Sequence, residues 1–132
     1  MSAVREEVTV LVVDDQLPFR LAAARMLAPE DGFRLVGEAE DGEQAVEMAA
    51  VLAPALVLMD VRLPGIDGIE ATRRILASHP GTAVVLVSTH AVGDLPPSLA
   101  SCGARGFLRK HEVDPDTLEA LLESPSNTAR TR

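Results

Sequence analysis

Runs of apolar residues alternate along this chain with segments in which apolar residues recur at helical spacing. Three of the runs are apolar throughout, as in strands that are covered on both faces of a parallel sheet. Two further segments are shorter or carry charge, which is typical of strands at the edges of a sheet. In chain order, the five predicted strands are 8–13, 34–39, 55–59, 83–87 and 106–108.

The segments that follow these strands predict helices. In the first of them, Pro18 is tolerated in the opening turn and Pro29 ends the helix. Its predicted apolar face consists of Leu17, Leu21, Ala24 and Ala28. The second and third helices each begin with an aspartate that is followed three residues later by Gln or Glu, the pattern of a capping box. These pairs are Asp41 with Gln44 and Asp67 with Glu70.

The last two predicted helices differ in regularity. Asp94 is a candidate cap for the fourth, but residues 95 and 96 each precede a proline, so this helix is expected to be short, at about 97–102. The fifth begins at Asp114-Pro115, an N-cap followed by proline at the first helical position. Its predicted buried face consists of Leu118, Leu121 and Leu122.

Strands that alternate with helices predict an α/β fold, a doubly wound five-stranded parallel sheet with helices on both faces. The first, third and fourth strands are the most apolar and therefore central, which favours the flavodoxin-like order 2-1-3-4-5. We expect one domain over residues 8–123, preceded by an N-terminal extension at 1–7. Residues 124–132 are polar and aperiodic, as in a disordered tail or a truncated linker.

Composition narrows the functional classes. The formal net charge is −8, which argues against direct nucleic-acid binding, because phosphate contacts require clustered Lys and Arg. A single cysteine, Cys102, fits a reducing compartment and excludes an internal disulfide. No apolar stretch is long enough for a membrane span or a signal peptide, so we expect a cytoplasmic protein.

Chemically active side chains follow four of the predicted strands. The first strand runs into Asp14-Asp15, the third into Asp60, the fourth into Ser88, and the fifth toward Lys110, the one lysine of the chain. Singly, such residues are usually caps, turn residues or solvated charges. Because parallel strands end at the same edge of a sheet, and ligands bind there at the switch point, we interpret the set as one site.

This set of side chains suits phosphoryl chemistry. Three carboxylates in one crevice repel each other, and a divalent cation would allow them to stay ionised together. Mg²⁺ fits an all-oxygen site that also receives phosphate, whereas the lack of an imidazole disfavours Zn²⁺. A carboxylate can act as nucleophile, and a hydroxyl and an ammonium can stabilise the equatorial oxygens during in-line transfer.

Four features of this sequence belong together: the Asp14-Asp15 pair, the block from Val57 to Gly68 with its L-P-G-I-D-G turn, Ser88, and the G-F-L-R-K segment that ends at Lys110. Together they resemble the motifs of the receiver domain of bacterial two-component response regulators. The resemblance covers Val8 to about Glu123. It implies a phosphorylation-controlled signalling module without turnover of an external substrate. The implied partners are a sensor histidine kinase or phosphotransfer protein, an output domain or partner protein, and a second copy of the chain.

The resemblance also implies a role for each site residue. Asp60 would be the phosphoacceptor, and Lys110 would bind the phosphoryl group. The implied Mg²⁺ ligands are Asp15, Asp60, the main-chain carbonyl of Arg62, and Asp14 through water. Ser88 and Phe107 would form the hydroxyl-aromatic switch pair.

Two departures from the family pattern affect this interpretation. His111 follows the lysine where the family often has a proline in a cis peptide, and Leu95-Pro96-Pro97 replaces part of a usually longer fourth helix. Three alternatives stay open. A phosphohydrolase with Asp60 as nucleophile would need an acid two residues later, where this chain has Arg62. A receiver-like domain could bind partners only, and a flavodoxin would lack Trp or Tyr to stack on its flavin.

Overall fold

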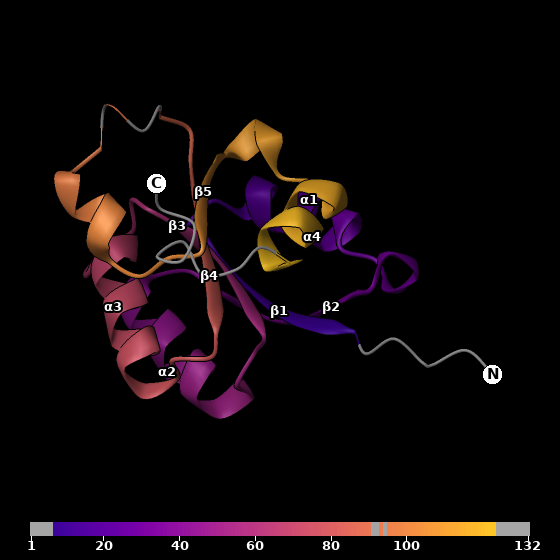
Figure 1. Cartoon of the computed structure of the whole chain (residues 1–132), viewed down its shortest axis with the longest axis horizontal. Helices are drawn as coiled ribbons and strands as arrows, with labels where there is room; N and C mark the ends of the chain where they lie inside the picture. Colours follow the sequence, from indigo (N-terminus) through magenta and orange to yellow (C-terminus); the bar gives the residue numbers. More distant parts are fainter. Residues whose placement is uncertain (1–6, 91–92, 94, 124–132) are drawn as a thin grey trace.

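The computed structural model describes residues 7–90, 93 and 95–123. They contain a five-stranded parallel sheet in the order β2-β1-β3-β4-β5, which confirms the predicted topology (Figure 1). The strands are β1 (Val8–Val13), β2 (Phe33–Ala39), β3 (Leu56–Asp60), β4 (Ala83–Ser88) and β5 (Gly106–Arg109). Strand order reverses between β1 and β3, so a crevice is expected at their carboxyl ends.

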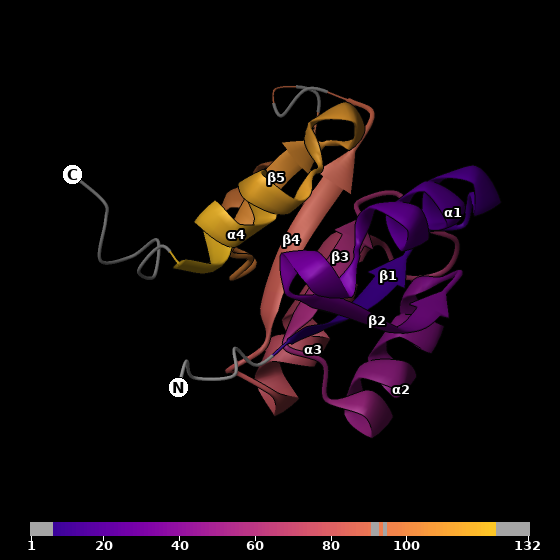
Figure 2. The same ribbon diagram turned by 90° about the vertical axis from the view of Figure 1, so that its right-hand side faces the viewer.

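Helices cover both faces of the sheet (Figures 1 and 2). One face packs against α2 (Gly42–Leu52) and α3 (Gly68–Ser78), with Ala45, Ala49 and Ile75 in the apolar core on that side. The other face packs against α1 (Leu17–Met26) and α4 (Pro115–Glu123), with Ala23 and Leu118 in the second core. Every residue of β3 and β4 is buried, which explains why these strands are apolar throughout.

The buried face of α1 differs from the one that we predicted. Leu17 and Leu21 are about half exposed, at 52% and 50%, whereas Phe19, Ala23 and Leu27 contact the core. The helix carries two apolar stripes at the same spacing, and the entry of the chain from β1 decides which of them faces the sheet. The α4 prediction is confirmed, because Leu118 is fully buried and both Leu121 and Leu122 pack against the same core.

The segment between β4 and β5 also differs from the prediction. Residues Pro97–Ser101 form a 3-10 helix, so the described residues contain four α-helices where we expected five. The two prolines explain the difference, since each disfavours helical geometry in the residue before it. Two further 3-10 turns cover Pro29–Asp31 and Lys110–Glu112.

The two predicted capping boxes form in part. Asp41 and Asp67 each accept the backbone N–H three residues on, at 2.7 and 2.8 Å. The return bonds differ, however, because Gln44 accepts from the N–H of Glu40, and Glu70 pairs with two arginines of its own helix.

Several expectations fall on residues that are not described. Apart from Glu7, the N-terminal extension lies outside the described residues, as do the tail at 124–132 and the possible cap at Asp94. Among the helices that the structure does describe, none combines the length and the apolar character needed to cross a bilayer.

Candidate functional site

Three carboxylates meet where β1 and β3 end. Asp14 and Asp15 directly follow β1, Asp60 is the last residue of β3, and Val13 pairs with Met59 in the register between these strands. One oxygen from each carboxylate lies within 4.8 Å of the others. Asp14 is fully buried and Asp60 is 7% exposed, whereas Asp15 is open to solvent. The structure therefore brings together the three acids that the sequence singled out.

Local backbone bonds orient two of these carboxylates. Oδ1 of Asp14 accepts the N–H of Gln16 at 2.8 Å, and Oδ1 of Asp60 accepts the N–H of Arg62 at 3.3 Å. The second oxygen of each group is therefore available to the crevice. Among the described residues, Oδ2 of Asp14 is a fully buried oxygen for which no partner completes a hydrogen bond of ordinary geometry.

Lys110 reaches the same point from the 3-10 turn after β5. Its Nζ lies 2.6 Å from Oδ2 of Asp14 and 3.8 Å from Oδ2 of Asp60. The first contact is an ion pair at short range, although its angles are not those of a hydrogen bond. The lysine side chain is 19% exposed, so its charge is only partly screened by water. The peptide before His111 is trans.

The surroundings of Asp60 alter its acidity. Burial, followed by the nearby Asp14 carboxylate, raises the pKa of Asp60 from 3.8 to about 6. The Lys110 ammonium and the Arg62 N–H oppose this rise, and Asp15 adds to it. A carboxylate whose pKa is about 6 is still mainly ionised at neutral pH and is a stronger base than an ordinary aspartate. Asp60 is therefore suited to act as a nucleophile with the assistance of a nearby cation.

The donor set of this site fits Mg²⁺. It offers three carboxylates and no imidazole or thiolate, and Mg²⁺ is bound in proteins through one or two carboxylates together with water. Oδ2 of Asp14 is a second indication, because this buried anionic atom is compensated by the Lys110 ammonium at 2.6 Å and the position therefore attracts a cation. Asp15 and Asp60 are the more open of the three groups and so the better candidates for direct contact.

An arginine that sequence reasoning missed fixes the acidic loop. Arg20 donates from Nη1 to the main-chain carbonyl of Asp14 at 2.7 Å and from Nε to Glu38 at 3.0 Å. Its Nη2 also lies 3.7 Å from Glu40, and the side chain is only 11% exposed. The arginine therefore joins the end of β1 to the end of β2. No signal in the sequence indicated this role, because the two carboxylates that Arg20 contacts are 18 and 20 residues further along the chain.

Ser88 and Phe107 lie on the two strands beyond β3. Ser88 is the last residue of β4 and is 1% exposed, and its Oγ accepts the N–H of His90 at 2.9 Å. Phe107 pairs in register with Leu86 and packs partly buried against the core on the α2 and α3 side. Ser88 and Phe107 therefore lie on adjacent strands, with Ser88 paired to Arg109 and Phe107 to Leu86.

Glycine is required where α3 begins. Gly68 donates its N–H to the carbonyl of Val61 at 2.8 Å, which closes the loop that follows Asp60. A Cβ atom at this position would lie closer to the carbonyl oxygen of Asp60 than the 3.0 Å that real Cβ atoms keep. Gly65 in the same loop has a φ of +74°, in the left-handed region that favours glycine. These two glycines explain the spacing of the L-P-G-I-D-G turn.

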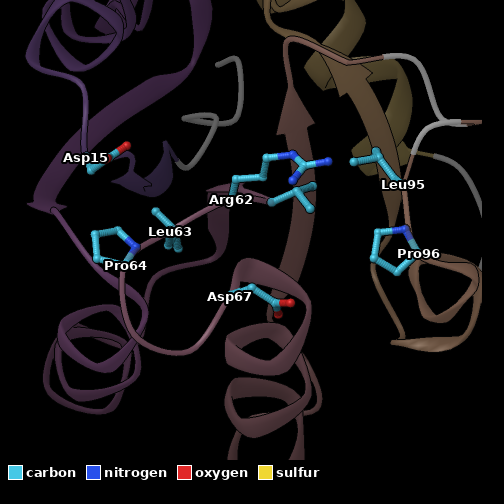
Figure 3. A pocket seen from close by; sticks show the side chains of 8 residues that line it. Asp15, Arg62, Leu63, Pro64, Asp67, Leu95 and Pro96 are labelled. Carbon is cyan, nitrogen blue, oxygen red and sulfur yellow. The ribbon is translucent and has the colours of Figure 1, made fainter.

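A cavity of about 800 Å³ opens beside the carboxylates. It lies between the loop after β3 and the segment before the 3-10 helix, and Arg62 extends across it toward Leu95 (Figure 3). Its lining residues are Asp15, Val61, Arg62, Leu63, Pro64, Asp67, Leu95 and Pro96. Because Asp15 belongs both to the cavity and to the acidic cluster, the cavity gives access to the site from solvent.

Comparison with known proteins agrees with this geometry. Residues 10–123 match the family described as the response regulator receiver domain. The chain belongs to this receiver family. Response regulator GacA of Pseudomonas protegens is 48% identical over 103 residues, which cover 78% of this chain and 48% of GacA. Response regulator UvrY of Escherichia coli is 36% identical over 114 residues, covering 86% of this chain and 52% of UvrY.

Solved receiver structures support the same assignment. The signal receiver domain of NarL from Mycobacterium tuberculosis superposes with a TM-score of 0.79 and 32% identity, covering 96% of this chain and 99% of that domain. The receiver described here spans about half the length of the curated relatives that it matches. The family is one of two-component signalling proteins.

Proposed function

We propose that this receiver takes a phosphoryl group onto Asp60 from a histidine of a sensor kinase or phosphotransfer protein, and that the modified domain then acts on a partner. The observation that carries the proposal is the arrangement of Asp14, Asp15 and Asp60 around one point, with the ammonium of Lys110 at the same place. Acids and a lysine that meet at a strand-end crevice are suited to binding a transferring phosphoryl group.

The transfer is an in-line displacement at phosphorus. Oδ2 of Asp60 is the attacking oxygen, because Oδ1 is engaged by the N–H of Arg62. A bond forms between this oxygen and phosphorus, and the bond from phosphorus to the donor histidine nitrogen breaks. The electron pair of the broken bond returns to the imidazole ring, and the product is an aspartyl phosphate. The same site would later admit water for slow autodephosphorylation.

The receiver residues would share the charge of the transferring group. Mg²⁺, when bound, would neutralise phosphoryl oxygens, and we assign Asp15, Asp60 and the main-chain carbonyl of Arg62 as its direct ligands. Asp14 is more deeply buried and would act through water. Lys110, already 3.8 Å from Oδ2 of Asp60, would move its ammonium from Asp14 onto a phosphoryl oxygen.

Movements of Ser88 and Phe107 would couple phosphorylation of Asp60 to a conformational change at the surface. The Oγ of Ser88 accepts a backbone N–H, so its own hydroxyl proton can be donated to a phosphoryl oxygen. A shift of Ser88 toward the phosphoryl group would vacate space that the partly buried Phe107 ring could enter. We expect the surface formed by β5 and residues 95–102 to change, and a partner or second copy to dock there.

We propose that the effect of phosphorylation is exerted outside the receiver domain. Curated relatives are about twice as long as the matched region, so an output domain or a separate partner protein would carry the effect of phosphorylation. The formal net charge of −8 disfavours direct contact of this receiver with nucleic acid.

Intact mass spectrometry tests the proposal. The receiver is incubated with acetyl phosphate and Mg²⁺, and we expect a mass increase of one phosphoryl group. Asp60→Asn should show no increase, whereas the control Asp41→Asn, which alters a helix cap but retains a good capping residue, should react like the parent. An adduct that persists in Asp60→Asn would refute the assignment, and continued hydrolysis of an external phosphomonoester would favour the phosphohydrolase alternative.

A further inference from the structure

The ammonium of Lys110 lies over an aromatic ring as well as beside two carboxylates. Its Nζ is 4.9 Å from the centroid of the Phe19 ring, within the range in which a cation is attracted to the negative face of an aromatic ring. Because the lysine side chain is only 19% exposed, this attraction is less weakened by water than on an open surface.

The start of α1 explains how the ring reaches this point. Helical side chains lean toward the N-terminus of their helix, and Phe19 is the third residue of α1. The N-terminus of α1 follows Asp14 and Asp15 almost directly, so a side chain that leans this way extends toward the acidic edge. The ring also packs against the core under α1 and α4, which limits its movement.

The Phe19 ring can restrain the Lys110 ammonium in a way that the carboxylates cannot. In the present structure Asp14 holds the ammonium at 2.6 Å, closer than the 3.8 Å to Asp60. Lysine has a flexible four-carbon stem, and its position is otherwise set by whichever anion is nearest. A contact with the face of a ring restrains the ammonium without accepting a localised hydrogen bond, so its N–H groups stay available for oxygen atoms.

We propose that Phe19 is a positioning residue for Lys110, and that its ring keeps the ammonium beside Asp60 where an arriving phosphoryl group meets it. This inference rests on the proposed function of Asp60. Loss of the ring would leave the metal ligands unchanged but allow the lysine to sample positions away from the site. The affinity for a phosphoryl group would then fall while the affinity for Mg²⁺ stays the same.

The composition of the chain makes the test direct. Lys110 is its one lysine, so lysine labelled with ¹³C at Cε gives one side-chain resonance. In the parent protein the aromatic ring current should shift the Hε signal from its position in a lysine peptide. Phe19→Leu should abolish that shift. The matched control is Phe33→Leu, which removes a ring from the same apolar core but at the amino end of β2, and it should keep the shift.

Beryllofluoride serves as the phosphoryl probe, with binding followed by ¹⁹F resonances at fixed Mg²⁺. Phe19→Leu should weaken beryllofluoride binding by about 3- to 10-fold, the range expected for loss of a partly desolvated cation–π contact. Mg²⁺ binding alone, measured by calorimetry, should match the parent. Trifluorophenylalanine at position 19 keeps the shape of the ring but reduces its negative face, so it should weaken beryllofluoride binding to an intermediate degree.

The outcomes separate the two proposals. If the parent fails to bind beryllofluoride, the proposed function of Asp60 is wrong. If the parent binds it and Phe19→Leu binds equally well, the positioning role of Phe19 is wrong. Two further results would show that the ring acts only through packing and would also overturn the inference. One is an equal loss of beryllofluoride affinity in Phe19→Leu and Phe33→Leu. The other is a fall in the Mg²⁺ affinity of Phe19→Leu together with its beryllofluoride affinity.

Discussion

The raised pKa of Asp60 predicts an unusual dependence of stability on pH. The folded state disfavours the charged carboxylate, so the group keeps its proton to a higher pH when folded than when unfolded. Below pH 3.8 the carboxyl is protonated in both states and contributes no penalty. As pH rises toward about 6 the unfolded chain loses the proton first, and the stability of the metal-free protein falls.

The magnitude follows from the size of the shift. A rise from 3.8 to about 6 corresponds to at most about 3 kcal/mol, because each pKa unit is worth roughly 1.4 kcal/mol. Water in the adjoining cavity reduces this value, and we expect about 1–3 kcal/mol. Asn at position 60 does not titrate, so without Mg²⁺ the stability advantage of Asp60→Asn over the parent should grow by this amount as the pH rises from 4 to 7.

Urea unfolding followed by circular dichroism, in the presence of a chelator, measures the effect. The difference between the two proteins is the informative quantity, because carboxyls with lowered pKa values, such as Glu70 and Asp114, contribute equally to both. We have proposed that Mg²⁺ binds the ionised carboxylate of Asp60, so adding Mg²⁺ should reduce the loss of stability with rising pH in the parent only. A difference that stays constant from pH 4 to pH 7, or that changes in favour of the parent, would refute the reasoning.

The remaining predictions concern the framework; urea unfolding checks the changes in stability, and intact mass spectrometry with acetyl phosphate checks the change in phosphorylation. Gly68→Ala should destabilise the protein by roughly 1–3 kcal/mol and reduce phosphorylation, because a Cβ atom there collides with the main chain of Asp60. The control Gly81→Ala places its Cβ in open space and should change neither stability nor phosphorylation appreciably. Ala53→Gly should stabilise it by up to about 1 kcal/mol, because residue 53 ends α2 with a φ of +46°; no gain would mean that the strain is already relieved. Leu118→Ala should cost about 2–5 kcal/mol as a fully buried side chain, and a smaller loss would show that α4 is dispensable to the core.

The sheet could be predicted because its strands are distinct in sequence. β3 and β4 are buried on both faces and therefore consist of consecutive apolar residues, and the charge of β2 marks it as an edge. The acidic cluster followed from the same reasoning, since the parallel topology brings Asp14, Asp15 and Asp60 to one edge whatever their side chains do.

The orientation of individual side chains could not be predicted in the same way. Two apolar stripes on α1 fit the helical period equally well, and only the packing of Phe19 and Ala23 on the sheet selects one. The contacts of Arg20 cross from α1 to β2, and nothing in the local sequence indicates a partner that lies 18 residues away. The reciprocal cap of Glu70 failed for a related reason, because two arginines on the same helix compete for its carboxylate.

The bridge made by Arg20 has a consequence for how this receiver can vary among its relatives. Glu38 is on the exposed side of β2, where substitutions are ordinarily tolerated. Here its carboxylate holds the guanidinium that fixes the main chain of Asp14, so a neutral residue at 38 would leave a largely buried cation with a weaker counterion. Positions 20 and 38 are therefore expected to change together in evolution, and a surface residue at the edge of the sheet is subject to the same constraint as the buried Asp14 of the acidic cluster.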